Sequence, residues 1–145
     1  MKIGGFLLAV LAILAVIMMS ESAWVFVDLP GAIFVILVGG GIVMAAHGAR
    51  GCSLLFRSRR LTQGSTECDD ARRVAETGIQ AFVAAGWLGV LVGVTQMLAA
   101  LDDPSTLGAG MAVALLTAFY GHAIAYLFWM PLARSLTASQ VQNAG

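Results

Sequence analysis

The sequence predicts an all-α, polytopic membrane protein with four transmembrane helices and with its N- and C-termini in the cytoplasm. Hydrophobic residues make up 59% of the 145 residues and charged residues only 11%, whereas soluble domains carry about 25% charged residues. Four apolar spans are expected, at residues 3–20, 29–47, 78–101 and 107–133, and none of them contains Asp, Glu, Lys or Arg. Each span is long enough to cross a hydrocarbon core about 30 Å thick at about 1.5 Å per residue.

Basic residues predict the orientation. With four spans, all eight Lys and Arg residues fall on one side of the membrane, which the positive-inside rule identifies as the cytoplasm. They are Lys2, Arg50, Arg57, Arg59, Arg60, Arg72, Arg73 and Arg134. The opposite loops carry Glu21, Asp28, Asp102 and Asp103 and no basic residue. The net charge of zero therefore conceals a complete segregation of the basic residues.

The first span, residues 3–20, is rich in Gly, Ala, Leu and Ile and has no functional polar group. We expect it to pack on the lipid side of the bundle. A signal peptide is the alternative, because Lys2 precedes the apolar run and Ser20, Ser22 and Ala23 are small. We favour a true helix, since the run exceeds the usual core of about 7–15 residues and no A-x-A cleavage site follows it.

The second span, residues 29–47, has a well-specified start. Asp28 is placed to cap the free amides of the helix, and Pro30 falls in the first turn, where a missing N–H costs little. Three consecutive glycines, residues 39–41, interrupt the span. Glycines let helices approach closely, so we interpret them as packing positions rather than a ligand site.

The predicted cytoplasmic loop, residues 48–77, is the only sizeable polar part of the chain. It is too short to build an independent core, although residues 68–77 favour a short amphipathic helix. The basic run at 57–60 is typical of a topology anchor or of a contact with anionic lipid headgroups, and we do not expect nucleic acid binding. Cys52 and Cys68 match no common metal-binding spacing, so no metal or cofactor is expected.

The third span, residues 78–101, carries Gly86, Gly89 and Gly93 at spacings of three and four residues. These spacings put the three glycines on one face of a helix, where a neighbouring backbone can come close. We interpret them as helix-packing positions.

The fourth span, residues 107–133, carries a stripe of small residues within an arc of about 60°. Its members are Gly110, Ala114, Thr117 and Gly121. Thr117 puts a hydroxyl near the middle of the membrane. A purely structural role remains open at this point, because threonine in transmembrane helices commonly bonds to the carbonyl four residues earlier.

Three segments of the chain resemble the MotA/TolQ/ExbB proton-channel family, and are closest to its MotA-type stator subunits. They are DLPGAIFVILVGGG at 28–41, GVLVGVTQMLAALDDPSTLGAGMAVALLTAFYG at 89–121 and MPLA at 130–133. The resemblance implies a bacterial inner-membrane protein in which five chains surround two copies of a single-span partner. That partner is MotB-like, TolR-like or ExbD-like, and its Asp takes and releases the ion.

The resemblance also implies roles for individual residues. Thr117 matches the pore-lining Thr of the last helix, and its stripe becomes the expected ion path, lined by Thr117, Gly110, Ala114, Gly121 and Val90. Pro131 matches a Pro near the inner end of that helix, for which a conformational or gating role is expected. The spans themselves hold no Asp or Glu. Because a proton carrier needs a titratable group at depth, a partner is expected to supply it.

The chain departs from the family pattern in three places. Val83 stands where the family usually has a Pro, and Val90 where many members have a second Thr. Loss of that hydroxyl removes an oxygen ligand for a hard cation, which favours protons over sodium. Flagellar MotA proteins also carry a much longer insertion where this chain has only residues 48–77.

His122 is the one titratable side chain in mid-span. On a helical wheel it lies about 140° from Thr117, near Tyr126 and Trp129, so it faces away from the stripe. We expect a packed, hydrogen-bonded histidine rather than a proton relay. His47, at the inner end of the second span, is expected to be interfacial.

Three functions are compatible with this pattern. The leading hypothesis is a proton-conducting subunit of a stator or energiser complex, and the alternative is a non-conducting MotA-like scaffold. A small four-helix drug exporter is disfavoured, because such carriers need a membrane-embedded acid. Enzymatic catalysis is not expected, since no nucleophile and base, metal cluster or phosphate loop can be assembled.

Overall fold

The computed structural model describes residues 28–57, 66–102 and 104–141, and near the N-terminus residues 8, 10–13, 15, 18 and 19. Its elements are α2 (Leu29–Arg57), α3 (Thr66–Ala99), α4 (Pro104–Ala123), the π-helix η3 (Ile124–Trp129) and α5 (Met130–Val141). The prediction of an all-α fold is confirmed for this part of the chain. Most of the predicted first span, 3–20, lies outside the described residues.

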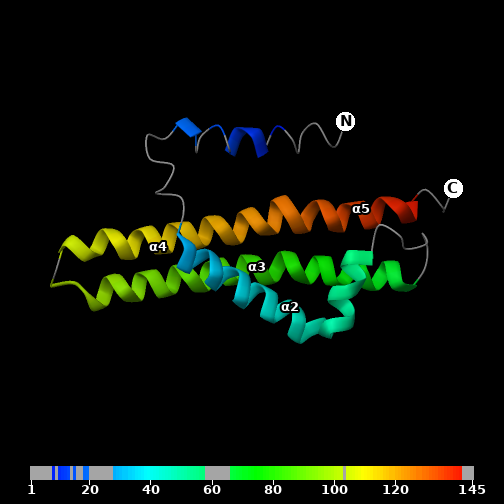
Figure 1. Ribbon diagram of the computed structural model, residues 1–145, viewed down its shortest axis with the longest axis horizontal. Coiled ribbons are helices and arrows are strands. Elements are labelled where there is room, and N and C mark those ends of the chain that lie inside the picture. Colours follow the sequence, from blue (N-terminus) through cyan, green and yellow to red (C-terminus); the bar gives the residue numbers. More distant parts are fainter. Residues whose placement is uncertain are drawn as a thin grey trace.

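Two long rods form the body of the fold (Figure 1). One is α3, and the other is the continuous run of α4, η3 and α5, which returns antiparallel beside it. Helix α2 crosses α3 obliquely. Three helices are long and apolar enough to span a membrane, at Leu29–Ala49, Glu67–Ala99 and Leu107–Leu136. The first predicted span, residues 3–20, and the orientation of the termini remain predictions.

The segment predicted as a cytoplasmic loop, 48–77, is helical at both its ends. Helix α2 continues to Arg57 across a kink at Gly48, whose φ is 65°. Helix α3 begins at Thr66, so the short helix expected at 68–77 is the first part of α3 rather than a separate element. Acidic residues in the first turn, Glu67 and Asp69, suit this start because they lie at the positive end of the helix dipole.

Only one of the three consecutive glycines in α2 makes the close approach that the sequence predicts. A Cβ on Gly39 would lie 2.9 Å from Cδ1 of Phe82 on α3, whereas Cβ atoms on Gly40 and Gly41 would meet nothing within 4 Å. The bend in α2 occurs further along, at Gly48. The interpretation of the glycine run as a packing feature therefore holds for Gly39 alone.

Small side chains dominate the core between the helices. The main buried cluster joins α2, α3, η3 and α5, and consists of Val35, Val43, Val74, Ala75, Ala81, Phe82, Ala85, Ala125, Trp129 and Ala133. A second cluster of Cys68, Ala71 and Leu136 holds the start of α3 against α5. Without a hydrophobic driving force inside a bilayer, such close packing of small residues is what holds helices together.

A π-helix corrects the helical-wheel prediction for the end of the last span. Pro131 has no N–H, and its ring would clash with the carbonyl four residues earlier in a straight α-helix. The chain instead widens at η3, where the N–H of Met130 donates to the carbonyl of Ala125, five residues back. The extra residue turns Trp129 toward α3, so the prediction that Trp129 lies beside His122 is wrong.

Candidate functional site

Thr117 lies where α4 meets α3, opposite the middle of the glycine face of α3. Its side chain is only 1% exposed, and among the described residues it is the one polar side chain classed as buried. A Cβ on Gly89 would lie 2.5 Å from Cβ and 2.6 Å from Oγ1 of Thr117. Because no larger residue fits at position 89, the glycine sets how closely α3 approaches the threonine.

The same close packing extends along both helices, and we call this contact the α3–α4 seam. A Cβ on Gly93 would lie 2.6 Å from the backbone nitrogen of Ala114 and 2.7 Å from the carbonyl of Gly110. Toward the other end, a Cβ on Gly121 would lie 2.7 Å from Cα of Gly86. Within one chain the seam is therefore closed by backbone against backbone.

The hydroxyl of Thr117 is satisfied within its own helix. Oγ1 donates to the carbonyl of Val113 at 2.8 Å and lies 3.1 Å from the carbonyl of Ala114. This is the back-bonded arrangement that the sequence left open as the structural alternative. Thr95 on α3 bonds to the carbonyl of Leu91 in the same way, at 2.8 Å, but on an exposed face.

The first turn of α2 also meets Thr117. A Cβ on Gly31 would lie 3.1 Å from Cγ2 of Thr117, and the backbone N–H of Asp28 donates to the hydroxyl of Tyr120 at 2.9 Å. Three helices thus meet at one point, through Gly31 of α2, Gly89 of α3 and Thr117 of α4. Sequence reasoning missed this junction, because the residues of α2 and α4 that meet there are separated by about ninety positions and share no local pattern.

Asp28 directly precedes α2, where the sequence predicts a helix cap. The residue is half-buried beside α4, and its Oδ2 is buried with no hydrogen-bond partner among the described residues. That oxygen occupies the space that a Cβ on Gly31, in the first turn of α2, would need. A helix N-terminus stabilises a nearby carboxylate through its dipole, even where no capping hydrogen bond forms.

Comparison with known proteins now decides the family. Residues 57–144, which include α3, α4, η3 and α5, match the MotA/TolQ/ExbB proton channel family. The chain belongs to this family. The resemblance to this family is thereby confirmed.

Several curated relatives are similar to the chain over part of its length. Motility protein A of Aquifex aeolicus is 53% identical over 55 residues, which cover 38% of this chain and 22% of that protein. Chemotaxis protein PomA of Vibrio alginolyticus is 40% identical over 79 residues, covering 51% of this chain and 31% of PomA. The chain thus spans less than a third of the length of these relatives.

The other expected ion-path and gating residues of this MotA/TolQ/ExbB family member lie in different settings. Gly110, Ala114 and Gly121 are buried in the seam with Thr117, whereas Val90 is half-buried on α3. Pro131 is half-buried at the start of α5, directly after the π-helix. The structure does not bring Val90 or Pro131 into contact with the hydroxyl of Thr117.

His122 is packed and hydrogen-bonded. Its Nδ1 donates to the carbonyl of Ala118 at 2.8 Å. The imidazole lies edge-on to Trp87, with ring centroids 6.3 Å apart, and 6.1 Å from the ring of Tyr126. His122 therefore also contacts α3, through the exposed ring of Trp87.

His47 links α2 to α3. Its Nε2 shares a hydrogen bond of 2.8 Å with Oγ1 of Thr77 on α3, just before the kink at Gly48. No group of three His, Cys, Asp or Glu that could hold a metal ion occurs in the part of the chain that the structure describes.

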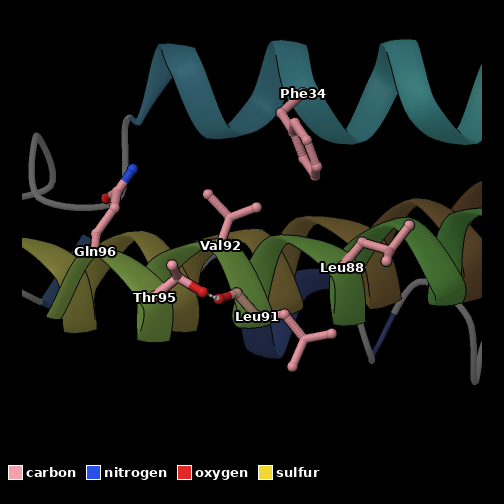
Figure 2. A pocket seen from close by; sticks show the side chains of 6 residues that line it. All are labelled: Phe34, Leu88, Leu91, Val92, Thr95 and Gln96. Carbon is pink, nitrogen blue, oxygen red and sulfur yellow. Dashed lines mark hydrogen bonds between the residues drawn. The ribbon is translucent and has the colours of Figure 1, made fainter. Parts of the chain in front are cut away.

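An apolar groove of about 380 Å³ lies between α2 and α3, away from the seam. Figure 2 shows Phe34 of α2 facing Val92 of α3 across it, with Thr95 and Gln96 toward one end. Leu88 and Leu91 complete the lining. Such a surface suits contact with lipid tails or with another helix.

Proposed function

We propose that the chain is a subunit of an ion-driven stator or energiser complex in the bacterial inner membrane. In this complex, proton flow across the membrane is coupled to mechanical work by a partner. Membership of the MotA/TolQ/ExbB family is the observation that carries the proposal. The similar proteins named motility protein A and PomA support a role in motility.

The ion path, in this proposal, forms only in the assembled complex. Within one chain the α3–α4 seam is closed, so an ion has to pass where Thr117 and its neighbours meet other subunits or the partner. Such surfaces are provided by a homo-oligomer, which is expected to be a pentamer as in the resembled family, and by a single-span partner. Movement of α3 away from Gly110, Ala114, Thr117 and Gly121 would expose the stripe to that partner.

The proposed ion is the proton rather than sodium. Val90 offers no oxygen, and the hydroxyl of Thr117 is engaged with its own helix. A hard cation such as sodium would need several oxygen ligands at the site. The spans contain no Asp or Glu, so the titratable carboxylate is expected to come from the partner.

The test is proton flux into liposomes that contain the chain together with its partner. Thr117→Val keeps the shape of the side chain and removes the hydroxyl, and should abolish flux while the complex still assembles. Thr95→Val is the matched control, because it removes a hydroxyl with the same back-bond on an exposed face. Normal flux with Thr117→Val, or equal loss with Thr95→Val, would contradict the proposed path.

A second function is favoured by one specific observation. Because the seam is closed and the Thr117 hydroxyl is fully used within α4, the chain could serve as a non-conducting scaffold that keeps the oligomer without transport. Flux above that of liposomes containing the chain alone would exclude the scaffold. Assembly of the complex without any flux would support it.

A further inference from the structure

The buried positions on the last span follow a pattern that a straight α-helix cannot keep. Between Thr117 and Ala133, buried residues recur at every fourth position, through Gly121, Ala125 and Trp129. In a straight helix each step of four drifts by about 40°, so Ala133 would point about 160° away from Thr117. The additional residue in η3 removes about 100° of this drift, and α5 faces α3 again.

A straight helix would present a second set of side chains to α3. Relative to Thr117, the positions of Phe128, Leu132 and Ser135 fall within about 60° when every residue advances by 100°. Each of these residues directly precedes a residue that is buried in the structure, namely Trp129, Ala133 and Leu136. We call the packing of these three buried residues against α3 the observed register, and the packing that a straight helix would give the straight register. Phe128 would replace another aromatic residue, Trp129. Ser135 would need no new hydrogen-bond partner, because its hydroxyl already donates to the carbonyl of Leu132 at 2.7 Å.

Each of the two registers carries a cost that the other avoids. The straight register forces the ring of Pro131 against the carbonyl of Leu127, which is unfavourable in a helix interior. The observed register buries the indole N–H of Trp129, which has no hydrogen-bond partner among the described residues. A buried donor without an acceptor is also costly, and Phe128 in the same place would have no polar atom to satisfy.

We propose that η3 is a register switch, which lets the inner third of the last helix exchange Trp129, Ala133 and Leu136 for Phe128, Leu132 and Ser135 against α3. The exchange turns α5 by about 100° without unfolding it. This proposal stands independently of ion transport, because it concerns two packings of one helix pair.

Disulfide trapping to the native Cys68 distinguishes the two registers. Cys68 is buried with Ala71 and Leu136, so in a Cys52→Ser background Leu136→Cys should cross-link to Cys68 in the observed register. Ser135→Cys should cross-link only in the straight register. Arg134→Cys, which faces away from α3 in both registers, gives the background rate. Absence of the Leu136→Cys cross-link would overturn the packing on which the switch depends.

Two substitutions should move the registers in opposite directions. Pro131→Ala removes the clash and should raise the ratio of the Ser135→Cys to the Leu136→Cys cross-link by about a hundredfold. Trp129→Phe removes the unsatisfied donor and should lower that ratio. The switch is refuted if Ser135→Cys never exceeds the Arg134→Cys background in any of these proteins, or if both substitutions shift the ratio the same way.

Deletion of Tyr126 provides a direct test of the geometry. In a Pro131→Ala background, which is free of the clash with the carbonyl of Leu127, removing one residue from η3 produces a straight helix that keeps the observed contacts of α5 with α3. The deleted protein should therefore insert into the membrane, retain the Leu136→Cys cross-link and lose the Ser135→Cys cross-link. A protein that no longer forms the Leu136→Cys cross-link would contradict the proposal.

Discussion

The backbone N–H of Asp28 donates a hydrogen bond of 2.9 Å to the hydroxyl of Tyr120, and this bond fixes the start of α2 beside the last turn of α4. Tyr120 lies one turn after Thr117, so the same contact holds Gly31 over the threonine. The position of the first turn of α2 is therefore coupled to the residue on which the proposed ion path depends.

Replacement of Tyr120 by Phe should loosen this contact while leaving the ring packed. Loss of the acceptor leaves a half-buried N–H unpaired and should lower the free energy of unfolding by about 1 kcal/mol. Faster hydrogen exchange at the amide of Asp28 is the specific measurement. Tyr126→Phe is the control, since that residue is 46% exposed. Unchanged exchange at Asp28 would show that the bond does not hold α2.

Addition of a methyl group at Gly89 should separate α3 from α4. The new Cβ would overlap Thr117, and overpacking of this kind typically costs about 1–3 kcal/mol. Gly41→Ala is the matched control, because its Cβ would meet nothing within 4 Å. Unfolding in mixed detergent micelles compares the two. Equal stability of both variants would contradict the close approach at Thr117.

The kink in α2 should depend on the backbone of Gly48 rather than on space around it. A Cβ there would meet nothing within 4 Å, yet φ of 65° with ψ of −179° is a region that is essentially restricted to glycine. We expect Gly48→Ala to cost about 1–3 kcal/mol, or to straighten α2. Distances between spin labels on either side of the kink measure this directly. Neither effect would be expected for Gly41→Ala.

Gly78 and Trp129 should show energetic coupling across α3 and η3. A Cβ on Gly78 would overlap the indole ring, so Gly78→Ala should be strongly destabilising in the parent protein. In a Trp129→Ala background the ring is absent and the same substitution should cost less than about 1 kcal/mol. A double-mutant cycle therefore measures the contact, with an expected coupling of about 1–3 kcal/mol. If the two substitutions have additive effects on stability, Trp129 does not contact Gly78.

The local sequence was sufficient to predict three membrane-spanning helices and the faces on which α3 and α4 pack. Apolar length gave these spans, and spacings of three and four residues gave the glycine face of α3 and the stripe around Thr117. These features follow from the regular geometry of a single helix. The family was likewise evident from short motifs in α3 and α4, and residues 57–144 confirm it.

Local spacing could not give the register of the last helix beyond His122. The wheel assumes a constant turn of about 100° per residue, whereas the chain inserts a π-helix before Pro131 and turns Trp129 toward α3. The same limit explains why only Gly39 of the three consecutive glycines packs closely, since contact depends on where α2 crosses α3.

The sequence by itself determined that this protein consists of membrane helices, which family it belongs to and which side of α4 carries the small residues. Tertiary structure alone decided that Asp28 meets Tyr120, that three helices converge on Thr117 and that α5 keeps its contact with α3. Helix formation depends on neighbouring residues along the chain, whereas crossing points and registers depend on the fit between segments that are distant in sequence.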